Sequence, residues 1–199
     1  KKTDITIVAG QNKTINISLK SGKGPHSVHE ENIWSFLSFL EASTPNFDDS
    51  LKKIVLKFHW CDGTLDNSGQ VKDREGKRAF IKKFPEEFKL YEEFFETIKH
   101  IIFDRVMLGT INIPDFLVYI NRKGEYLSTS MKKIKERHID LQNSWGLFSL
   151  QNCWACLKGQ DHGHKSHVCD PSCPKIKPKQ QKHRQDIQFK WSNIESVFE

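Results

Sequence analysis

The sequence predicts a globular fold that mixes strands and helices, of the α/β or α+β class. Alternating apolar residues occupy two stretches near the start, residues 5–8 and 15–19. Helical spacing of apolar residues recurs in 33–40 and, more extensively, in 88–102. A chain of 199 residues with 37% hydrophobic residues and 14 Phe can bury a sizeable core, which favours one domain over residues 1–199.

The first twenty residues predict a β-hairpin. The two alternating stretches are separated by Gly10-Gln11-Asn12, a typical turn sequence. A hairpin brings Asp4, before the first strand, to the same end as Ser18-Leu19-Lys20 in the second. Because side chains alternate between the faces of a strand, Ser18 and Lys20 project from one face. A carboxylate beside an ammonium at one sheet end suits an oxygen-coordinated metal and an activated water.

A helix is predicted to begin at Ser27. Ser27-Val28-His29-Glu30 has the form of a capping box, and apolar residues at helical spacing follow from Ile33. This helix would hold Glu30 in its first turn, close to Asp4 and Lys20. A structural interpretation stays open, in which Glu30 only caps the helix and Lys20 only ends a strand.

Together, Thr3-Asp4, Ser18-Leu19-Lys20 and Ser27-Val28-His29-Glu30 resemble the metal centre of the PD-(D/E)XK nucleases. The closest likeness is to restriction endonucleases in which Ser replaces the acidic residue of the E-x-K strand and the following helix supplies a carboxylate. Thr3 departs from the usual Pro, and the gap from Lys20 to Glu30 is short. The resemblance implies a central mixed β-sheet flanked by helices. It also implies Mg²⁺ held by Asp4 and Glu30, with Lys20 acting on the attacking water and Ser18 adding a polar contact.

The activity implied is that of a cytoplasmic bacterial type II restriction endonuclease. It would hydrolyse phosphodiesters of double-stranded DNA at a specific sequence and leave 5′-phosphate ends. Cleavage of both strands requires two active sites, so a homodimer or a partner subunit is expected. Members of the family place a helix before the hairpin, so an N-terminal part is expected ahead of Lys1. The net charge of +6 fits a polyanionic partner, and no apolar run of 18 residues predicts a membrane span.

Two sets of basic residues are the expected DNA-backbone contacts. Lys23 lies in a glycine-bearing loop, and four more lie on a predicted helix over 128–138, namely Lys132, Lys133, Lys135 and Arg137. A basic helix face can also be merely solvated. Pro114-Asp115 with Ser130-Met131-Lys132 forms a second motif of nuclease type, which ranks lower because Lys132 falls within the predicted helix.

The remaining elements follow from local patterns. Strands are predicted at 54–58, 111–120, 145–157 and 188–191, and a turn at 121–124. A long helix is predicted to begin at Pro85 and to end at Gly109.

The C-terminal third contains a candidate zinc module over residues 153–173. Its thiols follow a Cys-x₂-Cys and Cys-x₃-Cys spacing, with three histidines between the pairs: Cys153, Cys156, Cys169 and Cys173. These ligand types and spacings predict one structural Zn²⁺, since four thiolates leave no open position for catalysis. Two disulfides are the alternative.

Two other functions remain open. A non-catalytic, zinc-containing nucleic-acid-binding protein would carry the same charge and the same cysteines, and an RNA nuclease would use the same chemistry. Phosphate-binding loops and the nucleophile elbow are not supported, because G-x-x-x-x-G-K-[ST], G-x-G-x-x-G and G-x-S-x-G do not occur.

We expect about one zinc ion per chain in the purified protein. Removing it should unfold the C-terminal third, because structural zinc supplies roughly 10–16 kcal/mol of apparent binding energy in small domains. Elemental analysis with thiol titration checks this. Metal-free protein whose four thiols react freely in the folded state would contradict it.

Overall fold

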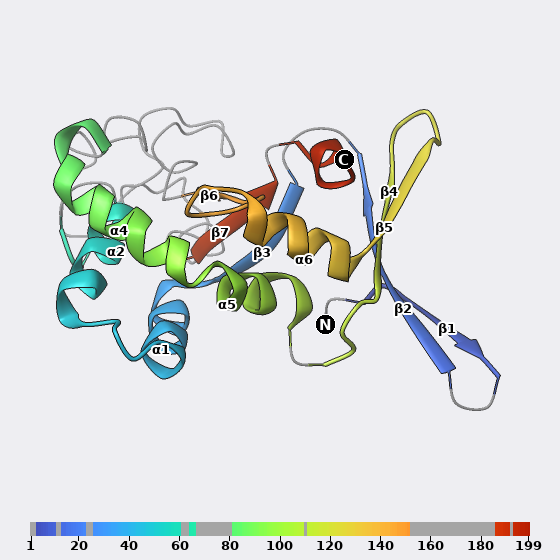
Figure 1. Cartoon of the computed structure of the whole chain (residues 1–199), viewed down its shortest axis with the longest axis horizontal. Coiled ribbons are helices and arrows are strands. Elements are labelled where there is room, and N and C mark those ends of the chain that lie inside the picture. Colours follow the sequence, from blue (N-terminus) through green and yellow to red (C-terminus); the bar gives the residue numbers. More distant parts are fainter. Residues whose placement is uncertain are drawn as a thin grey trace, which may run out of the picture. The chain divides into compact units, whose positions relative to one another are not determined.

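A computed structural model of the chain describes residues 3–10, 13–22, 26–60, 64–66, 81–109, 111–151, 186–191 and 193–199. The fold is of the mixed α+β class, as predicted, with a mixed sheet flanked by helices (Figure 1). The chain divides into two compact units. The first combines Lys1–His29, Phe95–Ser149 and Phe189–Glu199, and the second combines Glu30–Phe94 and Leu150–Gln188.

The first unit is built on a four-stranded sheet with the strand order β1-β2-β4-β5. Strands β1 (Ile5–Ala9) and β2 (Lys13–Ser21) are antiparallel, with Ile5 opposite Ile17, so the predicted hairpin is confirmed. Strand β4 (Phe116–Ile120) runs parallel to β2, and β5 (Tyr126–Ser130) runs antiparallel to β4. The β4–β5 turn falls at the predicted place, where Gly124 has a φ of 82°.

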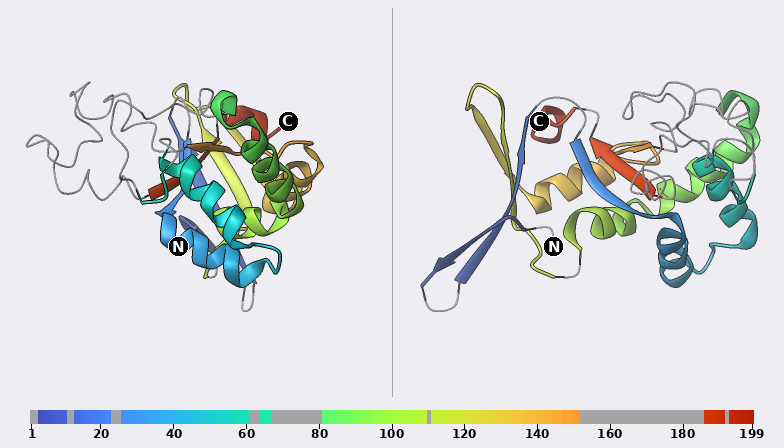
Figure 2. Two further views of the ribbon diagram at one scale, coloured as in Figure 1. Left: turned by 90° about the vertical axis from the view of Figure 1, so that its left-hand side faces the viewer. Right: turned by 180° about the vertical axis from the view of Figure 1, so that it is seen from behind.

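The four strands are strongly staggered. β1 pairs with residues 13–17 of β2, whereas β4 pairs with residues 17–21. The two hairpins therefore extend in different directions from the middle of β2 (Figure 2). Residues 5–9 and 13–17 form a two-stranded ribbon, called the arm below.

The predicted strand over 111–120 is shorter than expected. It begins at Phe116, because Asn112 has a φ of 53° and Pro114 cannot donate to a ladder. Asp115 starts the pairing through the hydrogen bond that its backbone N–H donates to the Asn16 carbonyl at 2.7 Å.

The long predicted helix is confirmed as three successive segments. These are α4 (Pro85–Thr97), α5 (Lys99–Phe103) and the π-helix η2 (Asp104–Leu108), which ends at Gly109 with a φ of 66°. The predicted basic helix is α6 (Met131–Asp140), capped by Ser130, whose hydroxyl accepts from the Lys133 N–H. In the first unit α6 packs on α5 and on β5.

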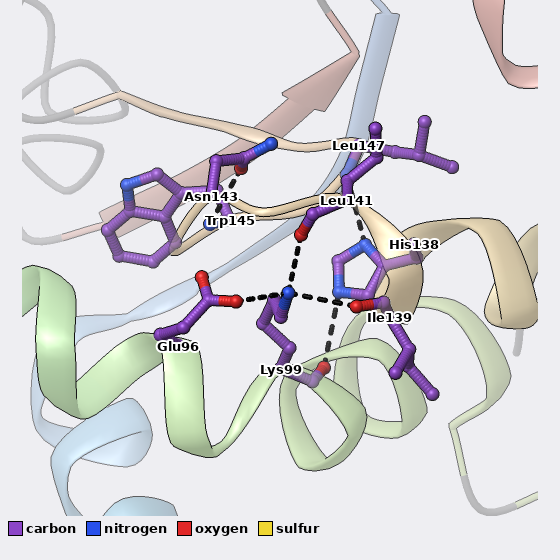
Figure 3. A network of polar contacts seen from close by, with 8 residues as sticks. All are labelled: Glu96, Lys99, His138, Ile139, Leu141, Asn143, Trp145 and Leu147. Atoms are coloured by element: carbon purple, nitrogen blue, oxygen red, sulfur yellow. Dashed lines mark hydrogen bonds and ion pairs between the residues drawn. The ribbon is translucent and has the colours of Figure 1, made fainter.

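A buried lysine joins these helices (Figure 3). The Lys99 ammonium contacts the Glu96 carboxylate and donates to the carbonyls of Ile139 and Leu141 at 2.9 and 2.5 Å. Its three N–H donors are matched by three acceptors. Lys99 is only 6% exposed, and these contacts compensate its buried charge. They also connect α5 to the end of α6.

His138 is the second buried member of this network. Its Nδ1 accepts from the Leu147 N–H at 3.1 Å, and its Nε2 lies 3.2 Å from the Lys99 carbonyl. Burial, followed by the nearby Lys99 and Lys135 charges, lowers the pKa of His138 to about 4. The ring is therefore neutral at physiological pH and fixes the 141–148 segment against α6.

The second unit contains α1 (Ile33–Ser43), α2 (Asp49–Trp60) and most of α4. Its core is aromatic: Phe58 lies 5.1 Å from Tyr91, and Phe47 stacks on Phe94 at 5.4 Å. The strand predicted at 54–58 is wrong, since these residues lie in α2. The Asp48 carboxylate accepts from the Leu51 N–H near the start of this helix. Residues on several sides of α2 are buried, and this is why alternation was a misleading signal: Ile54, Val55, Leu56, Phe58 and Trp60.

A second, three-stranded sheet has the order β3-β7-β6. Strand β7 (Asp186–Trp191) confirms the strand predicted at 188–191. The strand predicted over 145–157 begins only at Ser149 in β6 (Ser149–Gln151), and its remainder lies outside the described residues. β3 (His26–Asn32) replaces the predicted first helical turn, so the capping box at Ser27 is wrong. The N-cap of α1 is Asn32, whose side chain accepts from the Trp34 N–H at 3.0 Å.

Within the described ranges, the helices are all too short or too polar to span a lipid bilayer.

Gly146 is required by the space around His138. Its φ is 55°, and a Cβ atom there would lie 2.4 Å from the His138 ring and 2.5 Å from its carbonyl oxygen. We expect Gly146→Ala to lower the free energy of unfolding by roughly 2–6 kcal/mol, since left-handed strain and overpacking each cost about 1–3 kcal/mol. Urea denaturation measures this.

Gly124→Ala is the matched control. Gly124 also has a positive φ, but a Cβ atom there meets nothing within 4 Å. It should therefore show the strain cost alone. Equal destabilisation by the two substitutions would contradict the packing assigned to His138.

Candidate functional site

Asp4 lies at the start of β1, beside the middle of β2. Its backbone N–H donates to the Ile17 carbonyl at 2.9 Å. Its carboxylate oxygen Oδ2 accepts from the Leu19 N–H at 2.7 Å and lies 3.3 Å from the Ser18 hydroxyl. The predicted meeting of Asp4 with the Ser18-Leu19-Lys20 strand is thus confirmed. All of these residues belong to the first unit.

The contacts of Asp4 use one carboxylate oxygen. Among the described residues, Oδ1 has no hydrogen-bond partner, and the side chain is exposed. Thr3, by contrast, is buried, and its hydroxyl donates to the Asn112 carbonyl. Thr3 therefore anchors the backbone next to Asp4, at the position where Pro is usual in the resembling nucleases.

Lys20 lies on the same face of β2 as Ser18, two residues further on. Ser18 is 6% exposed, whereas Lys20 is half-buried. Nζ of Lys20 forms no ion pair or hydrogen bond with any residue that the structure describes. The site therefore presents an exposed carboxylate and an ammonium that no described acidic group neutralises.

Sequence reasoning missed the support that β4 gives this site. Tyr119 lies opposite Lys20 in the parallel ladder, and its hydroxyl donates to the Gly22 carbonyl at 2.7 Å. Gly22 has a φ of 103° just after β2, so this bond fixes the chain where it leaves the Lys20 strand. No local sequence pattern predicts the hydrogen bond between Tyr119 and Gly22, because these residues are 97 positions apart.

Glu30 does not lie in the first turn of a helix. It is exposed in β3, and it belongs to the second unit. Glu30 and Glu31 consequently point to opposite faces of a strand, rather than differing by one helical step. The carboxylate pair of Asp4 with Glu30 therefore remains a prediction.

The lower-ranked motif, Pro114-Asp115 with Ser130-Met131-Lys132, also contacts β2. Asp115 accepts from the Asn16 N–H at 2.8 Å through Oδ2, on the β4 side of the strand. Lys132, however, lies in α6 with 86% of its side chain exposed and faces Glu136 at 3.9 Å. The motif therefore lacks a lysine on a strand beside its carboxylate.

The predicted basic face of α6 is partly neutralised by its own unit. Lys135 pairs with Asp104 at 2.6 Å, and Arg137 lies 3.6 Å from Glu199. Lys132 and Lys133 are exposed. Any phosphate contact of α6 would thus begin with these two residues.

Two predicted elements fall outside the described residues. These are Lys23 and the zinc module with Cys153, Cys156, Cys169 and Cys173. Within the described ranges, no three acidic, histidine or cysteine side chains gather into a group that could hold a metal ion. Of the two predicted Mg²⁺ ligands, Asp4 lies beside β2 in the first unit and Glu30 lies in β3 in the second.

No protein-family model and no curated protein sequence matches this chain.

Proposed function

We propose that the protein is a Mg²⁺-dependent endonuclease of the type II restriction-enzyme kind, acting on double-stranded DNA at a specific sequence. The observation that carries the proposal is the junction of Asp4 with Ser18-Leu19-Lys20, where Oδ2 of Asp4 lies 2.7 Å from the Leu19 N–H. The same residues make up the motif that resembles the PD-(D/E)XK nucleases. The net charge of +6 supports a polyanionic substrate.

The donor chemistry at Asp4 fits Mg²⁺. This ion keeps several waters and is commonly held by one or two carboxylates together with substrate phosphates. Oδ1 of Asp4 is available among the described residues, and Glu30 would supply the second carboxylate. When bound, the ion would neutralise phosphate charge and lower the pKa of a coordinated water.

Each of the other steps would be assigned to a residue of the first unit. Asp4 is held by the Leu19 N–H, so its free oxygen is presented in a fixed direction. Lys20 would hydrogen-bond the attacking water and offset the charge that develops on the phosphate. Ser18 would orient the Asp4 carboxylate, from which its hydroxyl lies 3.3 Å. Tyr119 would position Lys20 indirectly, by fixing the end of β2 through Gly22.

A non-catalytic nucleic-acid-binding protein is the second candidate. The observation that favours it is the use of Asp4 within the sheet, since an aspartate that satisfies a strand-edge N–H has a structural role without any metal. Such a protein would bind DNA in a salt-sensitive manner and would not nick it when Mg²⁺ is added.

The proposal is tested by incubating plasmid and phage DNA with the protein and Mg²⁺, and mapping the ends. Asp4→Asn should lower the cleavage rate by at least roughly a hundredfold, because it removes the charge that holds the metal. Its melting temperature should stay close to that of the wild type, since the Asn carbonyl still accepts from Leu19.

Asp115→Asn is the matched control, with the same change on the other side of β2. Asp115 also accepts a strand N–H, so its substitution disturbs the sheet to a similar degree. It should leave cleavage largely intact. Loss of cleavage with Asp115→Asn but not with Asp4→Asn would transfer the site to the β4–β5 hairpin.

A second pair of variants tests Glu30 as the second carboxylate ligand of Mg²⁺. Glu30→Gln should nearly abolish cleavage while DNA binding in Ca²⁺ persists, because the change removes a metal ligand and no bulk. Glu31→Gln, on the opposite face of β3, should retain activity. The reverse result would move the ligand by one residue. Full activity of both variants would show that β3 contributes no metal ligand.

A further inference from the structure

The segment 111–115, which precedes β4, lies beside the start of β1. The Thr3 hydroxyl donates a hydrogen bond to the Asn112 carbonyl, 109 positions further along the chain. The Asp115 N–H donates to the Asn16 carbonyl at 2.7 Å, so the same segment also contacts β2. All of these residues belong to the first unit. We call the hydrogen bond between Thr3 and Asn112 the Thr3 link.

The segment is held mainly through its backbone. Of its five side chains, that of Pro114 alone is buried. Ile111 is 70% exposed and Ile113 49%, so these two isoleucines add little packing. Thr3, by contrast, is only 4% exposed. The Thr3 link is therefore a polar contact made at the buried end of the threonine, where water cannot easily replace a lost partner.

Asn112 takes part in the link through its backbone conformation. Its φ is 53°, in the left-handed region, and its carbonyl is the acceptor for Thr3. Asparagine adopts this region more readily than most residues other than glycine. The Asn112 side chain itself is exposed. The link thus requires a residue at position 112 that tolerates a positive φ, whereas it does not require the amide group of the side chain.

The link acts on the residue next to Thr3, which is Asp4. β2 holds Asp4 from one side, because the Asp4 N–H donates to the Ile17 carbonyl at 2.9 Å and Oδ2 accepts from the Leu19 N–H at 2.7 Å. The Thr3 link holds the preceding residue from a different segment of the chain. Fixing the backbone on both sides of a residue removes rotations that would otherwise redirect its side chain. The carboxylate is thereby presented in one direction.

We propose that Thr3 and Asn112 are positioning residues for Asp4, and that their hydrogen bond fixes the carboxylate that would hold Mg²⁺. The inference rests on the proposed function, in which Asp4 is a metal ligand. Neither residue would touch the metal or the DNA, and both would act through Asp4. Hydrogen-bonded partners behind a metal ligand commonly set the affinity for the metal. Thr3 would do by hydrogen bonding what a proline at this position does by fixing φ.

Hydrogen exchange of the Leu19 amide, followed by NMR without metal or DNA, tests the link directly. This amide is held by Asp4, so it reports how firmly the carboxylate is placed. Thr3→Val keeps a branched side chain of similar size and removes the hydroxyl. It should accelerate exchange of the Leu19 amide by roughly fivefold to tenfold, as expected for the loss of about one hydrogen bond. Thr3→Ser keeps the hydroxyl and should exchange like the wild type.

The Leu147 amide is the internal control. It is held by Nδ1 of His138 in the same unit, so it reports whether the unit as a whole has loosened. Its exchange should be the same in the wild type and in Thr3→Val. Circular dichroism melting of each variant checks that the unit stays folded.

A pair of substitutions at Asn112 separates the backbone from the side chain. Asn112→Gly keeps the carbonyl and favours a positive φ, so the Leu19 amide should exchange as in the wild type. Asn112→Val places a β-branched residue where φ is positive, which is strained. It should accelerate Leu19 exchange as Thr3→Val does. The opposite order of the two variants would show that the side-chain amide, rather than the left-handed backbone, matters.

The Mg²⁺ dependence of plasmid cleavage connects the link to the site. Thr3→Val should raise the Mg²⁺ concentration for half-maximal cleavage by roughly tenfold or more, which is the usual effect of losing a hydrogen-bonded partner of a metal ligand. Cleavage at saturating Mg²⁺ should change much less, because every ligand is still present. Thr3→Ser should restore the wild-type Mg²⁺ dependence.

Three results would overturn the inference. These are unchanged Leu19 exchange in Thr3→Val, equal acceleration of the Leu19 and Leu147 amides or unfolding of the unit, and faster Leu19 exchange in an enzyme whose Mg²⁺ dependence is unaltered. A wild type that never cleaves DNA, combined with the expected exchange rates, would sink the nuclease assignment and leave the positioning of Asp4 standing. Cleavage by the wild type with no effect of Thr3→Val on exchange would sink the inference and leave the nuclease standing.

Discussion

The parallel pairing of β2 with β4 is the constraint on which the first unit depends. It pairs residues that lie 99 positions apart in the sequence, and side-chain hydrogen bonds secure it at both ends. Asp115 holds the Asn16 N–H at the beginning, and Tyr119 holds the Gly22 carbonyl at the end. Parallel strands need a long crossover connection, and here much of the chain lies between them. The candidate site lies on the strand that this pairing immobilises.

Local patterns predicted the hairpin at Asp4 and the long helix from Pro85, because both are set by neighbouring residues. Local patterns gave the wrong secondary structure where residues on several sides of an element are buried, because the apolar residues then no longer follow the spacing of a helix. Residues 54–60 are buried on several sides, so alternation at Ile54, Leu56 and Phe58 looked like a strand inside a helix. Ser27 to Glu30 satisfied the rule for a helix cap, yet β7 is the neighbour of this segment in a sheet. Rules for helix caps consider only neighbouring residues, so they cannot take account of a strand partner far along the chain.

The residues of the candidate site also fall into those that local sequence predicted and those that it did not. Asp4, Ser18 and Lys20 were predictable together because one short turn connects their strands. Glu30 was placed by a helix that begins only at Ile33, so its part in the site did not follow from local spacing. Tyr119 and the buried Lys99 network could not be predicted, since each needs partners from elements 40 or more residues away. Saturated groups such as Lys99 have a structural role, whereas the Lys20 ammonium has no partner among the described residues.

The distance of β4 from the arm has a kinetic consequence. At translation rates of about 5–20 residues per second, β1 and β2 leave the ribosome roughly 5–20 s before β4. A hairpin can form within about 1–10 μs, but an isolated one is marginally stable in water. The nascent arm would therefore wait for a strand not yet synthesised. On a polysome many such arms would be exposed at once, each with β4 still to be synthesised.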